Sequence, residues 1–170
     1  SVTQLFTPKW IVQYMVDNTL GQFWKEARPS TTITNGLEFY MKPNNPELIP
    51  SREVKSLEEI KFFDPCVGSA HVLYYAFDVF YRMYEEEGYN PTYIPELIIS
   101  KNLYGIDIDD RAAQLAGFAL MMKGRNYHRR FFRKQVIPNI TAFQNIDSSP
   151  KFENAKVLGS LINISQEEVD

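Results

Sequence analysis

Two short apolar runs, each with an acidic residue at its end and a long helical segment after it, constrain the fold of this chain most strongly. The first run ends at Asp64, and the second contains Asp107 near its end. The segment 71–84 is apolar nearly all round, which predicts a buried helix, and 111–123 is predicted as another long helix. A third apolar run covers 137–143. This alternation of strand and helix predicts a parallel sheet with covering helices.

A helical segment and a proline-rich connection precede the first strand. Thr7 is expected to cap the first helix, with Pro8 at its first helical position. The connection contains four prolines and little periodicity, which is typical of a long surface segment. We therefore expect an N-terminal helix over 1–28, a linker over 29–56, an α/β core over 57–145 and a C-terminal segment over 146–170 that is truncated.

The charge balance argues against a stand-alone nucleic-acid-binding domain. The chain has 18 basic and 21 acidic residues and a net charge of −3, whereas such domains carry a strong basic excess. If DNA is the substrate, most of the surface that binds it is expected elsewhere.

The single cysteine, Cys66, cannot form an intramolecular disulfide, and no apolar run is long enough to cross a membrane. These features predict a cytoplasmic location. Two histidines without partner cysteines predict no metal site.

The turn after the first strand has the composition of a ligand-binding turn. The small residues Gly68, Ser69 and Ala70 let the backbone pass close to a ligand, and the following helix presents free N–H groups. Asp64 lies at the carboxyl end of the strand, where open α/β sheets bind ligands. Its carboxylate would repel a phosphate, so a ligand with a positive centre or hydroxyls is expected. The alternative is a strand–turn–helix corner with a capping aspartate and no ligand.

A second acidic position lies at the end of the second strand. Asp107 is placed to accept both ribose hydroxyls of an adenosine, and Ile108 to pack against an adenine face. Asp109 is expected to cap the next helix. The alternative is a set of helix-capping acids without a ligand. The presence of both motifs in this order favours a nucleoside ligand.

Three motifs in this order resemble those of the amino-methyltransferases that modify adenine in DNA. That family carries Phe-Thr-Pro before a helix, Asp-Pro-x-x-Gly-Ser-Gly after the first strand and Gly-x-Asp/Glu-Ile-Asp in the second. The corresponding residues here are Phe6-Thr7-Pro8, Asp64-Pro65-Cys66-Val67-Gly68-Ser69-Ala70 and Gly105-Ile106-Asp107-Ile108-Asp109. The resemblance covers 1–145 and includes the large methylases of type I, type IIG and phage-exclusion (BREX-type) systems. It implies an incomplete Rossmann-like fold for an S-adenosylmethionine-dependent methyltransferase.

The resemblance also implies a cofactor, S-adenosyl-L-methionine, and a role for each matching residue. Thr7 and its surrounding backbone would contact the methionine part of the cofactor. Asp64 and the turn after it would hold the amino group, while Asp107 would bind the ribose and Ile108 would flank the adenine. The complete cofactor-binding set is Phe6, Thr7, Pro8, Asp64, Pro65, Gly68, Ser69, Ala70, Asp107 and Ile108. Ala70 replaces the last glycine of the family motif, which weakens cofactor binding if that position needs a positive φ or close ligand approach.

The catalytic signature of this family, Asn/Asp-Pro-Pro-Tyr/Phe on a fourth strand, does not follow Asp107. Asn90-Pro91-Thr92-Tyr93 is similar to it but precedes the second strand, so we interpret it as a β-turn. No catalytic residue is therefore assigned, and the chain is expected to be part of a larger restriction–modification or phage-defence enzyme. Other parts of that enzyme would bind DNA, and a restriction or specificity subunit or domain is a possible partner.

Two rival functions remain open. A nicotinamide- or flavin-binding domain would have Gly-x-Gly-x-x-Gly after the first strand, where this chain has one glycine. A decayed, non-catalytic methylase that helps a partner recognise DNA would retain the motifs present here. A cofactor-binding measurement would discriminate between the nicotinamide rival and the methylase.

A basic and aromatic run lies between the last predicted helix and the third strand. Its basic members are Arg125, Arg129, Arg130, Arg133 and Lys134, and Tyr127, Phe131 and Phe132 lie between them. Such a run can contact phosphate. The commoner arrangement, which we favour here, is an amphipathic helix whose basic side chains extend past an apolar face to water.

Overall fold

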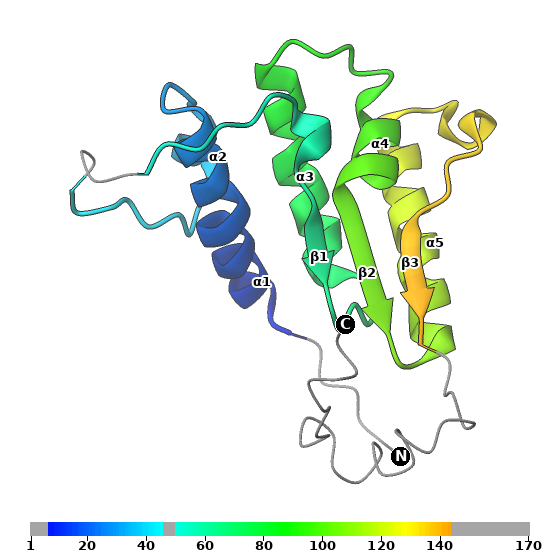
Figure 1. Ribbon diagram of the computed structural model, residues 1–170. Coiled ribbons are helices and arrows are strands. Elements are labelled where there is room, and N and C mark those ends of the chain that lie inside the picture. The colour runs from blue at the N-terminus through cyan, green and yellow to red at the C-terminus, as the bar shows by residue number, and fades with distance from the viewer. Residues whose placement is uncertain (1–6, 46–49, 144–170) are drawn as a thin grey trace, which may run out of the picture.

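The computed structural model describes residues 7–45 and 50–143, so the predictions for Phe6 and for 146–170 lie outside the described residues. Three parallel strands form one sheet in the order β1-β2-β3 (Figure 1). They are β1 (Phe62–Asp64), β2 (Leu103–Asp107) and β3 (Asn139–Ala142). The predicted alternation of strands and helices is confirmed, and the architecture is that of an incomplete Rossmann-like α/β fold.

The helices gather on one side of the sheet. In Figure 1, α3 (His71–Glu86) and α5 (Asp110–Tyr127) lie behind the strands, and α1 (Lys9–Val16) packs beside α3. A π-helical turn (Asp17–Gly21) joins α1 to α2 (Gln22–Ala27). The shorter elements are 3-10 turns at Ile33–Gly36, Leu57–Glu59 and Phe131–Lys134, the helix α4 (Ile94–Leu97) and a π-helical turn at Ile98–Asn102. None of the helices in the described ranges combines the length and apolar character needed to cross a bilayer.

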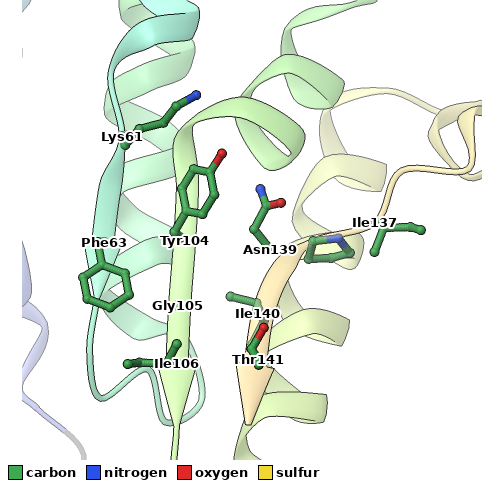
Figure 2. Close-up of a pocket in the computed structure, with 10 residues that line it drawn as sticks. Lys61, Phe63, Tyr104, Gly105, Ile106, Ile137, Asn139, Ile140 and Thr141 are labelled. Atoms are coloured by element: carbon green, nitrogen blue, oxygen red, sulfur yellow. The ribbon is translucent and has the colours of Figure 1, made fainter. Parts of the chain in front are cut away.

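The two faces of the sheet have different surroundings. On the helical face, Leu103 is fully buried and Phe62 packs against the core. On the opposite face, Phe63 is 53% exposed and lies beside Tyr104 and Ile106, as Figure 2 shows. A hollow of about 770 Å³ lies over this face, and no element within 7–45 or 50–143 covers it. Because parallel sheets are normally covered on both faces, the described sheet has only half of its usual packing.

The centre of the core is α3, which lies between the sheet and the N-terminal helices. Its buried side chains lie on one broad face of the helix and include Phe77, Phe80 and Tyr84, which are fully buried. Trp24 of α2 packs into the same core. The predicted buried helix is therefore confirmed for the face that contacts these two layers, whereas Tyr74 and Arg82 lie on an exposed side.

The connection over 29–56 is less superficial than its proline content predicts. Ile33 and Leu37 are buried in the main core. The backbone N–H of Thr32 donates to a carboxylate oxygen of Glu86 at 2.7 Å, which fixes the connection to the end of α3. Apolar contacts and this charged acceptor hold a segment that lacks regular periodicity, so the expectation of a surface segment is corrected for these residues.

The observed helix ends correct two predictions. Pro8, with φ −55° and ψ 142°, is the N-cap of α1, and its carbonyl accepts from Ile11 and Val12, so Thr7 lies one residue outside the helix and forms no cap bond. The helix predicted over 111–123 continues as α5 to Tyr127, so Gly124 lies inside it. A Cβ atom at Gly124 would lie 2.7 Å from the Phe131 ring, so this glycine serves close packing.

The buried side chain of Asn102 joins three parts of the fold at the amino ends of the strands. Its Nδ2 donates to the carbonyls of Leu57 and Ile60, both at 2.8 Å, and its Oδ1 accepts from the Tyr84 hydroxyl at 2.9 Å. Asn102 and Tyr84 are both fully buried. Since buried polar groups need partners, this amide fixes the start of β2 against α3 and the segment that enters β1.

Replacing Asn102 with Ala should lower the free energy of unfolding by about 3 kcal/mol, because two buried carbonyls and one hydroxyl lose their partner. Denaturant titration would measure the change. Asn126 is exposed on α5, and Asn126→Ala should change the same quantity by less than about 0.5 kcal/mol. A loss below about 1 kcal/mol for Asn102→Ala would contradict this assignment.

Candidate functional site

A cavity of about 690 Å³ lies at the carboxyl ends of β1 and β2, where open α/β sheets bind ligands. Four residues of the predicted cofactor-binding set line it, namely Thr7, Asp64, Gly68 and Ser69. They come from the segment before α1 and from the turn between β1 and α3. The structure therefore brings two motifs that are far apart in sequence to one cavity.

Three hydrogen bonds shape the turn after β1. The N–H of Cys66 donates to Asp64 Oδ1 at 3.0 Å, which closes a local turn. The N–H of Val67 donates to the carbonyl of Ile106 at 2.9 Å, and the N–H of Gly68 donates to Asp107 Oδ2 at 2.8 Å. The last two bonds attach the turn to the end of β2.

Gly105 permits this close attachment. A Cβ atom on Gly105 would lie 2.8 Å from the side chain of Val67 and 2.9 Å from that of Ile140. Any larger residue would force the turn or β3 away from β2. The glycine that begins the third motif therefore has a steric role, whereas the acids after it carry the polar chemistry.

Asp107 connects the two motifs directly. Its Oδ1 accepts the N–H of Asp109 at 2.9 Å, while its Oδ2 accepts the N–H of Gly68. The bond from Asp109 lowers the pKa of Asp107 most, and the N–H groups of Gly68 and Ile108 add to this effect against the opposing effect of burial. A carboxylate has about four acceptor sites, so capacity remains for hydroxyl donors. Its proposed contact with a ribose stays a prediction.

The pKa of Asp64 is shifted in the opposite direction to that of Asp107. Burial raises the pKa of its carboxyl above the ordinary value, and the nearby negative charge of Asp107 adds to this, although the N–H of Cys66 opposes it. A positively charged group of a bound ligand would stabilise the ionised form of Asp64. The arrangement favours a cationic or hydrogen-bond-donating ligand over a phosphate.

The backbone of the turn adopts two left-handed conformations. Gly68 has φ +50°, and an added Cβ atom would meet no other atom of the chain closer than 4.0 Å. A glycine is therefore required at this position by the backbone conformation and not by close packing. Ala70 has φ 65° and ψ 25° and is fully buried. Its methyl group therefore belongs to the core, and the substitution for glycine produces backbone strain without narrowing the cavity.

Several other residues considered in the sequence analysis lie at or outside the border of the cavity. Ile108 is 87% exposed and is open to contact with a flat ligand face, but it does not line the cavity, and neither do Pro8 and Pro65. Cys66, the single cysteine, is exposed and lines the cavity. Asp109 caps α5 as predicted, because its Oδ1 accepts from Arg111 at 2.8 Å.

Several cavity residues have no motif that would reveal them. Met15 and Leu115 are exposed apolar side chains on α1 and α5 that line the cavity, and Arg111 and His71 line it as well. Exposed apolar positions on otherwise amphipathic helices are the only available sequence signal. No group of three or more potential metal ligands occurs within the described ranges.

The sequence Asn90-Pro91-Thr92-Tyr93 forms a turn, as predicted. The N–H of Tyr93 donates to the carbonyl of Asn90 at 2.9 Å, and the N–H of Thr92 donates to the Asn90 side chain at the same distance. The turn precedes α4, which leads to the amino end of β2. It is therefore remote from the cavity at the carboxyl ends.

Replacing Ala70 with Gly should change the free energy of unfolding by less than about 1 kcal/mol. Relief of left-handed strain contributes about 1–2 kcal/mol. Loss of a buried methyl group, about 0.8 kcal/mol, and the greater backbone entropy of glycine, about 0.5–1 kcal/mol, offset it. Ala70→Val should instead destabilise by at least about 2 kcal/mol, because a branched side chain is added to a buried left-handed position. Thermal unfolding would compare them, and equal stabilities for the two variants would refute this interpretation.

The amino-acid sequence of this chain is similar to those of known methyltransferases. No family model matches it. It is 42% identical over 152 residues to the adenine-specific methyltransferase BrxX of Escherichia coli O9:H4 (strain HS), a match that covers 85% of this chain and 12% of that protein. It is 43% identical over 152 residues to the adenine-specific methyltransferase PglX of Lacticaseibacillus casei (strain Zhang), which covers 82% of this chain and 13% of that protein. The chain thus spans about an eighth of these relatives, and the resemblance to adenine methyltransferases of the BREX type that its motifs predict is confirmed.

Proposed function

We propose that this chain is the S-adenosylmethionine-binding portion of a DNA adenine-N6 methyltransferase from a phage-defence system. One observation carries the proposal: Thr7, Asp64 and Gly68 line one cavity, and the N–H of Gly68 donates a hydrogen bond to the carboxylate of Asp107. The similarity to proteins named adenine-specific methyltransferases supports it.

The chemistry of the cavity fits this cofactor. S-adenosylmethionine carries a sulfonium, an ammonium group and two ribose hydroxyls, and when bound it supplies an activated methyl group. Asp64 would hold the ammonium group, and Asp107 would accept the hydroxyls. Gly68 leaves open space where a Cβ atom would stand, which gives a ligand close access to the backbone. Ile108 would cover one face of the adenine.

The chain's own contribution to the reaction would be positioning and electrostatics. The acceptor would be the exocyclic amine of an adenine extruded from the duplex, presented by other parts of the full-length protein. Those parts would also carry the catalytic Asn-Pro-Pro-Tyr motif and most of the DNA-binding surface. A specificity or restriction subunit would be a natural partner. The need for access to the genome agrees with the cytoplasmic location expected from the sequence.

The cofactor assignment predicts that S-adenosylhomocysteine binds the full-length protein and NAD does not. Asp107→Ala should weaken S-adenosylhomocysteine binding by about 1–3 kcal/mol, because the hydroxyl donors and the Gly68 N–H lose a charged acceptor. Isothermal titration calorimetry would measure both ligands.

Asp110→Ala provides a matched control for this experiment. Asp110 lies in the first turn of α5, where its carboxylate accepts only from Gln114 in the described structure, at 2.6 Å. Its removal should leave the affinity for S-adenosylhomocysteine within about twofold, since surface substitutions typically change free energies by less than about 0.5 kcal/mol. Unchanged affinity in Asp107→Ala would remove the ribose assignment.

The activity itself predicts N6-methyladenine in the host genome at one short, non-palindromic sequence. Deleting the full-length gene should abolish this modification, because the encoded protein would be the enzyme that transfers the methyl group to this sequence. Single-molecule sequencing of wild-type and deletion strains would test it. An identical adenine methylation map in both strains, under conditions where the protein is expressed, would instead favour a non-catalytic module.

A further inference from the structure

Four arginines surround one shallow cavity at the end of the sheet opposite to the proposed cofactor site. The cavity measures about 460 Å³ and is lined by Arg125, Arg129, Arg130, Phe132 and Arg133. We name these five residues the arginine cluster. They lie on the last turn of α5 and on the segment that leads to β3, which is the yellow part at the upper right of Figure 1.

The positive charge of the arginine cluster is not neutralised within the described structure. The ion pairs found in 7–45 and 50–143 involve Arg28, Arg52, Lys123 and Lys134, and none involves a cluster arginine. The residues 125–134 include five basic and no acidic side chains, although the whole chain has a net charge of −3. The described part of the chain therefore concentrates guanidinium groups without ion-pair partners at one place.

The demands of the fold do not explain this concentration. The negative end of the α5 dipole stabilises cations near the last turn, which accounts for Arg125 but not for the three arginines beyond the helix. The amphipathic-helix interpretation fails, because α5 ends at Tyr127 and only a short 3-10 turn follows. Phe131 is buried against Gly124, whereas Phe132 is 52% exposed.

We propose that the arginine cluster binds a strand of nucleic acid, with guanidinium groups on successive phosphates and one base stacked on Phe132. Guanidinium forks match phosphate geometry, and exposed aromatic rings beside them are the usual platform for unpaired bases. An acidic protein surface could pair with the arginines but would leave Phe132 without a stacking partner. The nucleic-acid assignment therefore uses every residue that lines the cavity.

The position of the cluster separates it from the reacting base. The 18 residues of α5 span about 27 Å between the proposed cofactor cavity and the cluster. The strand would thus be held outside the proposed catalytic edge, as a second contact that guides a flanking or displaced strand. This inference does not depend on the cofactor assignment, because its residues and its ligand are distinct.

Fluorescence anisotropy with a labelled, mixed-sequence 12-nucleotide DNA would test the proposal on this chain. The double variant Arg129→Glu/Arg130→Glu should bind at least tenfold more weakly. Its slope of log affinity against log salt should be shallower by about 1.4, which corresponds to two single-strand phosphate contacts. The double variant Lys42→Glu/Lys55→Glu makes the same change in charge at exposed positions of the 29–56 connection. Its affinity for the DNA should stay within threefold of that of the unaltered chain.

Phe132→Leu separates stacking from charge. It should weaken binding by at least about fivefold with an unchanged salt slope, since stacking on one aromatic ring is lost. In the full-length protein, 5-iododeoxyuridine in the bound strand should crosslink on irradiation to the peptide that contains Phe132. S-adenosylhomocysteine affinity should be unaltered in the arginine variant, which distinguishes this site from the cofactor site.

Three outcomes would overturn the proposal. Equal losses in the arginine and lysine variants would show that only net charge matters. Competition by polyglutamate as strong as by unlabelled oligonucleotide, at equal charge concentration, would assign the cluster to acidic protein. A crosslink map of the full-length protein without the Phe132 peptide would show that the strand does not stack there.

Discussion

The hydrogen bond from the N–H of Gly68 to the carboxylate of Asp107 connects the two halves of the candidate site, and the local structure depends on it. It joins a turn that follows β1 to the end of β2 across 39 positions in the sequence. The neighbouring bond from Val67 to Ile106 and the absence of a side chain at Gly105 bring the same two segments together. With this connection in place, the turn, the helix start and both acids share one edge of the sheet.

This connection explains why the two acids differ in chemistry. Asp107 receives backbone N–H groups, which lower its pKa, and remains charged. Asp64 is more deeply buried and lies near that charge, so its pKa is raised. Asp64 lines the cavity and Asp107 lies behind the turn that borders it, so the two acids place negative charge at this edge of the sheet. Gly68 adopts its left-handed conformation without strain because it has no side chain, so the backbone strain of this turn lies at Ala70.

The polar groups at the two ends of the strands have different roles. At the amino ends, Asn102 satisfies buried carbonyls and fixes the entry into β1 and β2. At the carboxyl ends, polar groups remain available to a ligand. The arginine cluster lies beyond the amino ends. On the open face of the sheet, shown in Figure 2, no helix of the described ranges covers the apolar side chains, whereas parallel sheets normally have a second helical layer there.

The sequence by itself determined the order of strands and helices, the parallel sheet, the turn at Asn90 and the two acidic strand ends. These features follow from local periodicity and from residues such as Asp64, Gly68 and Asp107, whose types restrict the backbone or the chemistry directly. The tertiary structure alone decided that Gly124 packs against a phenylalanine, that Leu37 enters the core and that Ala70 faces inward. It also placed Met15 and Leu115 at the cavity and brought four arginines around one phenylalanine. Contacts between distant segments are not encoded by local periodicity, because the same glycine or arginine satisfies several local patterns until its spatial neighbours are known.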